Sequence, residues 1–278
     1  MSPTELSRAF AAVRARLTSG DEFDPYRLDR RDPELVAALL PFFELINRRW
    51  LRLRVEGLEN LPAAQALFVG NHNGGIMGPD LSCTLATLWR HASQRPLYAM
   101  AHDFAMRHLT PLGRFIQGVG GMRADPKNAA QVLARGGNVL VYPGGDLEAF
   151  RHFKHRDRIV FGPRAGFVKV AQQAKVSLVP IVAHGAHRSS VILHEGEWLA
   201  RALGLTARAR LRRFPIALGL PWGVGVGPWV PFLPLPLGIR LRILAPIPAP
   251  PSVDPLEVRD LVVERMQAAL HDMAGEDR

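Results

Sequence analysis

Short apolar runs separated by helical patterns recur along most of this chain, and that alternation restricts the fold more than any other feature. Runs that suit buried or half-buried strands lie at residues 51–56, 66–70, 96–99, 139–142, 178–183 and 239–244. Apolar residues at helical spacing lie between them, at residues 81–91, 128–135 and 166–174. Strands that alternate with helices are typical of a mostly parallel sheet with helices on its faces. The sequence therefore predicts an α/β fold, a single domain with a mostly parallel mixed sheet flanked by helices.

The flanking segments set the limits of that domain. Residues 1–32 are polar and weakly patterned, which predicts an N-terminal extension with one helix and a loose connection. Residues 33–49 predict an apolar helix that ends in basic residues and Trp50, a composition that suits core packing and also a membrane surface. Asp254, Pro255 and Glu257 suit the cap and first turn of a last helix. We predict one domain over residues 33–278.

Residues 214–239 carry no charged side chain, and the stretch is long enough to cross a bilayer. It contains six prolines and five glycines, so it cannot form a regular helix. Exposed irregular backbone is not tolerated in hydrocarbon. Trp222 and Trp229 are of the residue type that settles at the membrane interface. The stretch therefore predicts an apolar loop region with short strands, which either packs internally or faces lipid at the interface.

The charge of the chain favours an anionic partner. Its 278 residues include 35 Lys and Arg against 25 Asp and Glu, a net charge of +10, which suits a phosphate-bearing substrate, anionic lipid or nucleic acid. The sequence has no basic block with interleaved aromatic residues and no helix-turn-helix or finger pattern, which argues against nucleic acid. Cys83 is the single cysteine, so an intrachain disulfide and a cysteine-based zinc cluster are excluded. The N-terminus lacks the uninterrupted apolar stretch of a signal peptide, and we expect a cytoplasmic protein.

A histidine follows the predicted strand at 66–70 on a glycine-rich turn, and a carboxylate follows it eight positions later. The unperturbed pKa of histidine lies nearest neutrality among side chains, so His72 is a natural general base. Asp80 is placed to orient the imidazole and to stabilise the imidazolium that forms when the base takes a proton. The alternative is a turn histidine that satisfies local backbone groups.

Three more segments follow this motif, in an order that carries a resemblance. They are GVGGMR at residues 118–123, VLVYPGG at 139–145 and VPIV at 179–182. Together the four segments resemble the glycerolipid and lysophospholipid acyltransferase superfamily, and the Pro-Gly-Gly form of the third is closest to its diacylglycerol-acyltransferase-like branch. The resemblance spans about residues 50–250, most of the chain.

The resemblance implies transfer of a fatty acyl group from coenzyme A or acyl carrier protein to a hydroxyl of a glycerolipid or lysophospholipid. His72 would take the hydroxyl proton, with Asp80 as its partner, and the alcohol would attack the thioester directly. The acyl thioester is a co-substrate, and no metal or other cofactor is implied. Arg123 matches a basic position near the acceptor's phosphate, where the guanidinium fork donates two parallel hydrogen bonds. The predicted substrate contacts are Asn71, Gly74, Gly75, Arg123, Pro143, Gly144, Gly145, Glu148 and Arg151.

Two features of the sequence depart from the family pattern. The usual first block is His-x4-Asp, whereas Met77 stands at that position here and Asp80 is the first carboxylate. We expect the three added positions to bulge out, so that Asp80 still reaches His72. The usual Glu-Gly-Thr-Arg of the third block is replaced by residues 144–147, which favours a neutral acceptor such as mono- or diacylglycerol over a phosphorylated one. Glu148 and Arg151 then either hold this turn by a salt bridge or reach substrate.

Other interpretations stay open on the sequence alone. The long His-to-Asp spacing would also suit a lipid-binding protein on the same fold that has lost catalysis. His184 and His187 are close to a metal-ligand spacing, but the sequence offers no second Cys/His pair for a zinc site. A nucleophilic route is disfavoured because the chain lacks a Gly-x-Ser-x-Gly elbow. The best-supported expectation is an acyltransferase that binds the membrane surface peripherally, with anionic lipid favoured by the basic residues.

Overall fold

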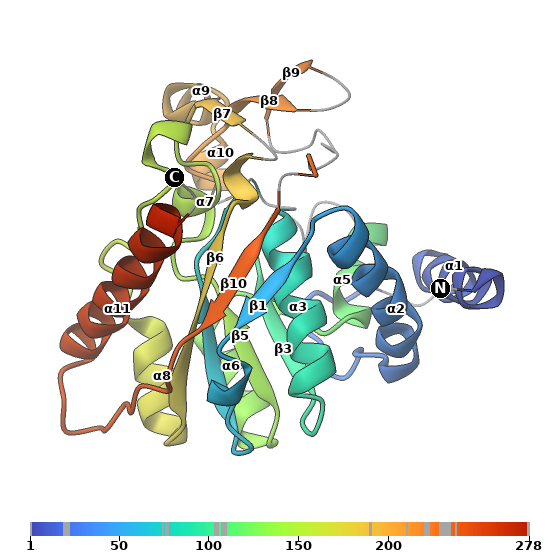
Figure 1. Ribbon diagram of the computed structural model, residues 1–278, viewed down its shortest axis with the longest axis horizontal. Coiled ribbons are helices and arrows are strands. Elements are labelled where there is room, and N and C mark those ends of the chain that lie inside the picture. The colour runs from blue at the N-terminus through green and yellow to red at the C-terminus, as the bar shows by residue number, and fades with distance from the viewer. Residues whose placement is uncertain are drawn as a thin grey trace.

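A seven-stranded sheet forms the centre of the molecule (Figure 1). The computed structural model describes residues 2–18, 23–73, 75, 78–102, 106, 110–188, 191–209, 211–219, 223–227, 235–236 and 238–276. The strand order is β1-β10-β6-β2-β5-β3-β4, and neighbours are parallel except β10 and β6, which are antiparallel. The strands are β1 (Arg54–Glu56), β2 (Ala66–Gly70), β3 (Leu97–Ala101), β4 (Gly121–Arg123), β5 (Asn138–Val141), β6 (Ser177–His184) and β10 (Arg240–Ile243). The predicted α/β fold with a mostly parallel mixed sheet is confirmed.

Helices cover both faces of this sheet. The helices of the described residues are α1 (Pro3–Leu17), α2 (Pro33–Arg49), α3 (Pro79–His91), α5 (Thr110–Gly118), α6 (Pro126–Ala134), α7 (Gly145–Ala149), α8 (Gly166–Ala174), α9 (Glu197–Ala202), α10 (Leu205–Ala209) and α11 (Pro255–Glu276), of which α9 and α10 lie beside the small sheet described below (Figure 1). The part of the chain that the structure describes also contains three short 3-10 turns: η1 (Leu58–Asn60), η2 (Phe153–His155) and η3 (Ala186–Arg188). None of the described helices is both long and apolar enough to cross a membrane.

Alternate residues of β2 pack into two different core layers. Leu67 and Val69 join the apolar side chains of α6, α8 and α11, whereas Ala66 and Phe68 join those of α2 and α3. Every residue of β2 is therefore buried, which explains why the strand is a continuous apolar run rather than an alternating one. Burial on both faces holds the carboxyl end of β2 in place, at the centre of the sheet.

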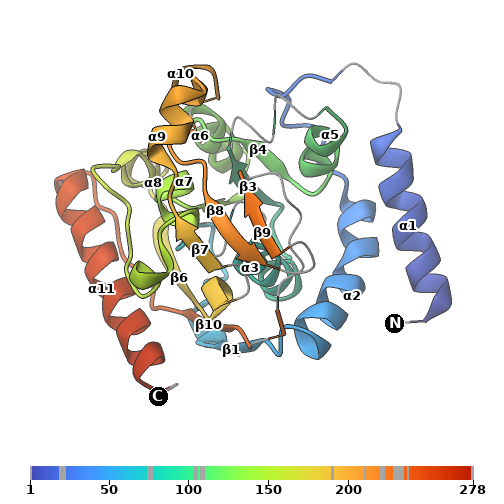
Figure 2. The same ribbon diagram turned by 90° about the horizontal axis from the view of Figure 1, so that it is seen from above.

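A second, three-stranded antiparallel sheet lies over the edge of the main sheet where β6 ends (Figure 2). It consists of β7 (Val191–His194), β8 (Ile216–Gly219) and β9 (Gly223–Val226). The last two strands fall within residues 214–239, so the short strands predicted there are confirmed for the described part of that stretch. Ala149 and Phe150 pack against Ile192 and Ala217 of this sheet, which ties it to the end of α7.

The element bounds differ from the sequence-based expectations mainly at the periphery. Helices at 33–49 and 166–174 and the strand at 66–70 have the predicted bounds, but the strand expected at 51–56 covers only 54–56. The N-terminal helix packs against α2 and α5, and Arg16 donates hydrogen bonds to the backbone oxygens of Arg30 and Arg114. The extension predicted at residues 1–32 therefore contacts the domain that follows it.

Candidate active site

Asn71 is the first residue after β2, and its side chain continues the strand pairing. Its Oδ1 accepts a hydrogen bond from the backbone N–H of Ala183 at 2.7 Å, and its Nδ2 donates to the Ala183 carbonyl at 3.0 Å. The amide thus takes the place of one more residue in the β2–β6 ladder and fixes the direction in which the chain leaves the sheet. Asn71 is predicted to contact substrate, but the structure engages its fully buried amide with the backbone of β6.

His72 and Asp80 form a hydrogen-bonded pair at the carboxyl edge of the sheet. His72 Nδ1 lies 2.9 Å from Asp80 Oδ2, and the same carboxylate oxygen accepts from the backbone N–H of Asn73 at 3.2 Å. Asp80 is buried in the first turn of α3, directly after Pro79. The Asp80 carboxylate therefore reaches the imidazole despite the longer spacing, as predicted.

Glycine is needed where the loop turns back toward α3. A Cβ on Gly78 would lie 2.1 Å from Asp80 Oδ1 and 2.2 Å from the Asn73 carbonyl oxygen, and Gly75 has a positive φ of 96°. Gly75 also donates its N–H to the carbonyl of Ala149 at 3.1 Å, so it is held by the end of α7. Gly74, the other glycine predicted to contact substrate, lies outside the described residues.

The contacts of the imidazole set both its tautomer and its basicity. Burial alone would lower the pKa of His72, but the charge and hydrogen bond of Asp80, together with the charge of Glu148, outweigh burial and raise that pKa above its ordinary value. Because Nδ1–H donates to the carboxylate, the lone pair of the neutral ring is on Nε2. The His72 side chain is 12% exposed, whereas its partner Asp80 is fully buried.

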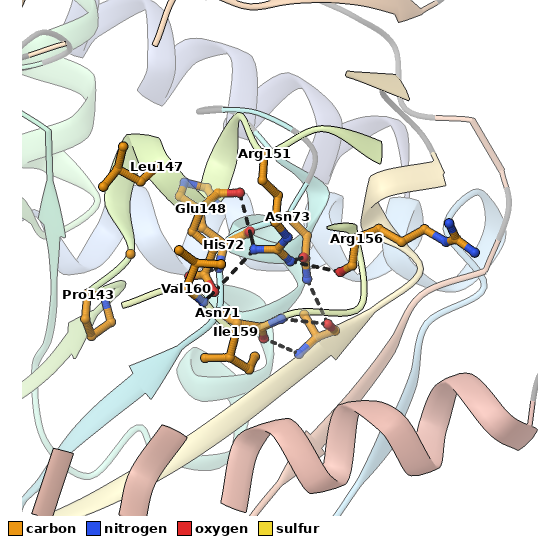
Figure 3. A network of polar contacts seen from close by, with 12 residues as sticks. Asn71, His72, Asn73, Pro143, Leu147, Glu148, Arg151, Arg156, Ile159 and Val160 are labelled. Atoms are coloured by element: carbon orange, nitrogen blue, oxygen red, sulfur yellow. Dashed lines mark hydrogen bonds and ion pairs between the residues drawn. The ribbon is translucent and has the colours of Figure 1, made fainter. Parts of the chain in front are cut away.

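Glu148 and Arg151 hold the backbone of the His72 loop from the other side (Figure 3). Glu148 Oε2 accepts from the His72 N–H at 2.9 Å, and Oε1 accepts from the Val160 N–H at 3.1 Å. Arg151 forms an ion pair with Glu148 at 3.3 Å and donates from Nη2 to Asn73 Oδ1 at 2.6 Å. Burial raises the pKa of Glu148, and the charge of Arg151 and the two backbone donors oppose that rise. Of the two alternatives for Glu148 and Arg151, the salt bridge is the one that the structure contains, and both side chains are buried.

The turn that precedes α7 is held by its carbonyl oxygens. Arg164 Nη1 donates to the carbonyls of Pro143 and Gly144, at 2.7 and 2.9 Å. Gly145 has a positive φ of 53°, and its N–H donates to the Tyr142 carbonyl at 3.1 Å. These contacts place the Pro143-Gly144-Gly145 turn at the end of β5, the strand next to β2.

Substituting Gly144 by alanine tests how closely the turn packs against Glu148 and Val160. The added Cβ would lie 2.4 Å from Glu148 Cβ, 2.5 Å from Glu148 Oε2 and 2.6 Å from the Val160 carbonyl oxygen. We expect Gly144→Ala to lower the free energy of unfolding by about 1–3 kcal/mol, because a crowded core site must shift.

Gly166→Ala is the matched control for that measurement. Gly166 begins α8, and the nearest atom to its added Cβ is Pro126 Cγ at 4.0 Å. Alanine there is expected to raise the free energy of unfolding by about 0.4–1 kcal/mol, because it restricts the unfolded chain. Urea unfolding of both variants measures the difference, and equal stabilities would contradict the close contact at Gly144.

Tyr142, Asn73 and Arg164 complete the site, and none of the three was among the residues predicted from the sequence. The Tyr142 ring lies beside the imidazole of His72, with centroids 4.9 Å apart, and occupies the space in which Gly70 has no side chain. Asn73 links the loop to β6, since its Nδ2 donates to the Ala183 carbonyl at 2.7 Å. The flanking of His72 by two asparagines is a sequence signal for Asn73, whereas no local pattern marks Arg164.

Arg123 lies apart from this cluster. It ends β4, which is separated from β2 by β5 and β3, so about 14 Å of sheet lies between the two strands at a strand spacing of about 4.8 Å. Its guanidinium lies over the Tyr26 ring, 4.5 Å from the ring centroid. Arg123 is therefore on the same edge of the sheet as His72, three strands away from it.

The remaining candidates for chemistry are buried. Cys83 is fully buried in α3, and burial raises the pKa of its thiol, which disfavours a nucleophilic thiolate. His184 and His187 are also buried, and His184 Nε2 lies 3.8 Å from Asp157 Oδ1. Among the residues that the structure describes, no group of three or more His, Cys, Asp and Glu side chains could hold a metal ion.

Comparisons with known proteins connect this geometry to a family. The family model described as Acyltransferase matches residues 52–184, the stretch that contains the His72 loop, Arg123 and the turn at 143–145. An uncharacterized protein of Mycobacterium leprae is 30% identical over 282 residues, which cover 96% of this chain and 73% of that protein. The chain belongs to the acyltransferase family.

Two further acyltransferases extend the comparison. Human diacylglycerol O-acyltransferase 2 is 26% identical over 163 residues, which cover 54% of this chain and 41% of that enzyme. The crystal structure of the 1-acyl-sn-glycerophosphate acyltransferase PlsC from Thermotoga maritima superposes with a TM-score of 0.56 at 15% identity, covering 95% of this chain and 88% of that one. That likeness shows a shared acyltransferase fold. The chain is therefore an O-acyltransferase of lipid metabolism, and the alternative of a lipid-binding protein without catalysis is set aside.

Proposed function

We propose that this enzyme transfers a fatty acyl group from an acyl thioester to a hydroxyl of a glycerolipid, with Nε2 of His72 as the general base. The observation that carries the proposal is the 2.9 Å contact between His72 Nδ1 and Asp80 Oδ2. A base whose other nitrogen donates to a buried carboxylate is oriented before substrate binds, and its protonated form is stabilised.

The residues suit direct transfer in two steps. Nε2 takes the proton of the acceptor hydroxyl while the hydroxyl oxygen attacks the thioester carbonyl, which gives a tetrahedral intermediate. The intermediate collapses by breaking the carbon–sulfur bond, and the leaving thiolate takes the proton back from Nε2. The product is an ester plus a thiol, and the imidazole returns to its neutral form. The raised pKa of His72 favours the imidazolium in the intermediate, where its charge lies next to Asp80.

We propose a neutral acceptor, mono- or diacylglycerol, rather than a phosphorylated one. Glu148 and Arg151 are buried beneath the His72 loop, and the Arg123 guanidinium lies over Tyr26, so these charged groups have partners within the protein. The name of the human relative, diacylglycerol O-acyltransferase 2, agrees with such an acceptor. The donor is acyl-coenzyme A or acyl carrier protein, and we place the reaction at the cytoplasmic surface of a membrane.

Mass spectrometry of the lipid products tests the proposal. The purified protein is incubated with acyl-coenzyme A, or with acylated carrier protein, and an equimolar mixture of lysophosphatidate, lysophosphatidylcholine, monoacylglycerol and diacylglycerol. The expected result is acylated product from monoacylglycerol or diacylglycerol with one of the donors. Product from lysophosphatidate alone would contradict the neutral acceptor, and free fatty acid without any ester product would contradict transfer to a lipid hydroxyl.

A further inference from the structure

The outward face of the three-stranded sheet is apolar at five of the six positions given by its strand pairing, and the sixth is His194 of β7, which is paired with Ile216. Val191 of β7 is paired with Leu218 of β8, and Leu218 is paired with Val224 of β9. Ile216 and Val226 form the next pair on the same face. Leu218, Val224 and Val226 are exposed, by 45%, 62% and 47%. An antiparallel sheet with one face on a core normally has polar side chains on the other, so this face departs from that pattern.

The inward face of the same sheet packs against the rest of the domain. Ile192 and Ala217 point inward and are buried against Ala149 and Phe150 at the end of α7. α7 also carries Glu148, whose carboxylate holds the His72 N–H. The contacts that hold this sheet on the domain are thus made by its inward face, and they fix its position relative to the imidazole through α7.

We propose that the outward face of β7, β8 and β9, the cap sheet, binds the surface of a bilayer that contains anionic lipid. This inference rests on the proposed function, because a lipid acceptor resides in such a bilayer. Contact through the cap sheet places the carboxyl edge of the main sheet next to the membrane, which shortens the path of an acylglycerol to His72 (Figure 2).

The charge of the surrounding chain favours an anionic bilayer as the occupant. Residues 195–213, just before β8, contain five arginines against two glutamates, a net charge of +3. The glutamates, Glu195 and Glu197, form ion pairs with Arg213, and Glu197 also pairs with Arg201. Each basic side chain near an anionic membrane surface adds attraction. Trp198 on α9, which directly follows β7, is 58% exposed and is of the residue type found at membrane interfaces.

The other apolar element at the surface is a weaker candidate. α2, which the sequence also suggested as a membrane contact, packs against α1 on one side and α3 on another. Its residues Phe42 and Phe43 are only partly exposed, and Phe43 packs edge-on against Trp89. Trp50 at the end of α2 and Phe10 of α1 are exposed as single residues. The cap sheet instead exposes three apolar residues on one face, and it is the contact that we propose.

Flotation with vesicles tests the proposal, using the whole chain. Wild type, the double variant Leu218→Asp with Val224→Asp, and the control Leu256→Asp are mixed with vesicles of phosphatidylcholine alone or of equal parts phosphatidylcholine and phosphatidylglycerol. Leu256 is 46% exposed in the first turn of α11, which begins at the end of the molecule away from the cap sheet (Figure 1). We expect the double variant to lose binding to the mixed vesicles by about tenfold or more, because two apolar contacts are replaced by charges that anionic lipid repels.

The outcomes separate this proposal from the proposed reaction. If wild type binds mixed vesicles, and the double variant does not, the docking surface stands even where no acyl product forms. Equal binding and equal product formation from vesicle-borne acceptor by both proteins would overturn the docking surface and leave the reaction intact. Light scattering is measured alongside, and a dimer that the double substitution dissociates without changing vesicle binding would assign the face to a second copy of the chain. The milder pair Leu218→Thr with Val224→Thr, which suits strands, replaces the aspartates if those prevent folding.

Discussion

Replacing His72 by alanine is expected to lower kcat for acyl transfer about 10³-fold, within the 10²–10⁴-fold range that a general base contributes. The alcohol then attacks without proton removal, while the binding surfaces for both substrates are unchanged. KM is expected to stay within about threefold, because the base acts mainly in the transition state. The rate is measured as thiol released from the acyl thioester in the presence of acceptor.

His155→Ala is the matched control for that experiment. His155 lies in η2 and is exposed, so its loss should leave both kcat and KM unchanged. His72 is partly exposed itself, and urea unfolding of His72→Ala should show that the variant stays folded. A folded His72→Ala protein with wild-type kcat would remove His72 from the mechanism.

The parts of this architecture that local patterns encode could be predicted from the sequence. The strand at 66–70 has its predicted bounds because burial on both faces demands a continuous apolar run. The approach of Asp80 to His72 could also be predicted, because the end of a strand and the start of the next helix lie on one edge of a parallel sheet. The two residues meet even though the spacing is longer than the family pattern.

The polar contacts behind His72 could not be predicted, because they join residues far apart in the chain. Asn71 and Asn73 both bind the backbone of Ala183, more than a hundred residues away, and nothing local marks that partner. The resemblance pointed to Glu148 and Arg151 as possible substrate contacts. Only their burial in the structure shows that they support the His72 loop instead. The antiparallel pairing of β10 with β6 likewise depends on the path of the chain through the cap sheet.

Replacing Asp80 by asparagine is expected to lower kcat about 10²–10⁴-fold while changing the side-chain volume little. The asparagine amide can present its NH2 group to Nδ1, which would place the ring proton on Nε2 and remove the lone pair that takes the hydroxyl proton. The neutral amide also stabilises the imidazolium less than the carboxylate does. Both effects act on the base without touching either substrate.

The pH profile separates this positioning role from a purely structural one. Asp80 raises the pKa of His72, so activity that needs the neutral imidazole is lost as the pH falls through that raised value. In Asp80→Asn the two largest raising influences are gone, while burial, which lowers the pKa, and the weaker raising charge of Glu148 are left, so the acid limb of kcat/KM should move to lower pH. Stopped assays of wild type and variant between pH about 5 and 9 measure the shift, a range that brackets the ordinary pKa of histidine. A lower rate with an unmoved acid limb would mean that Asp80 supports the fold of the loop but does not set the basicity of His72.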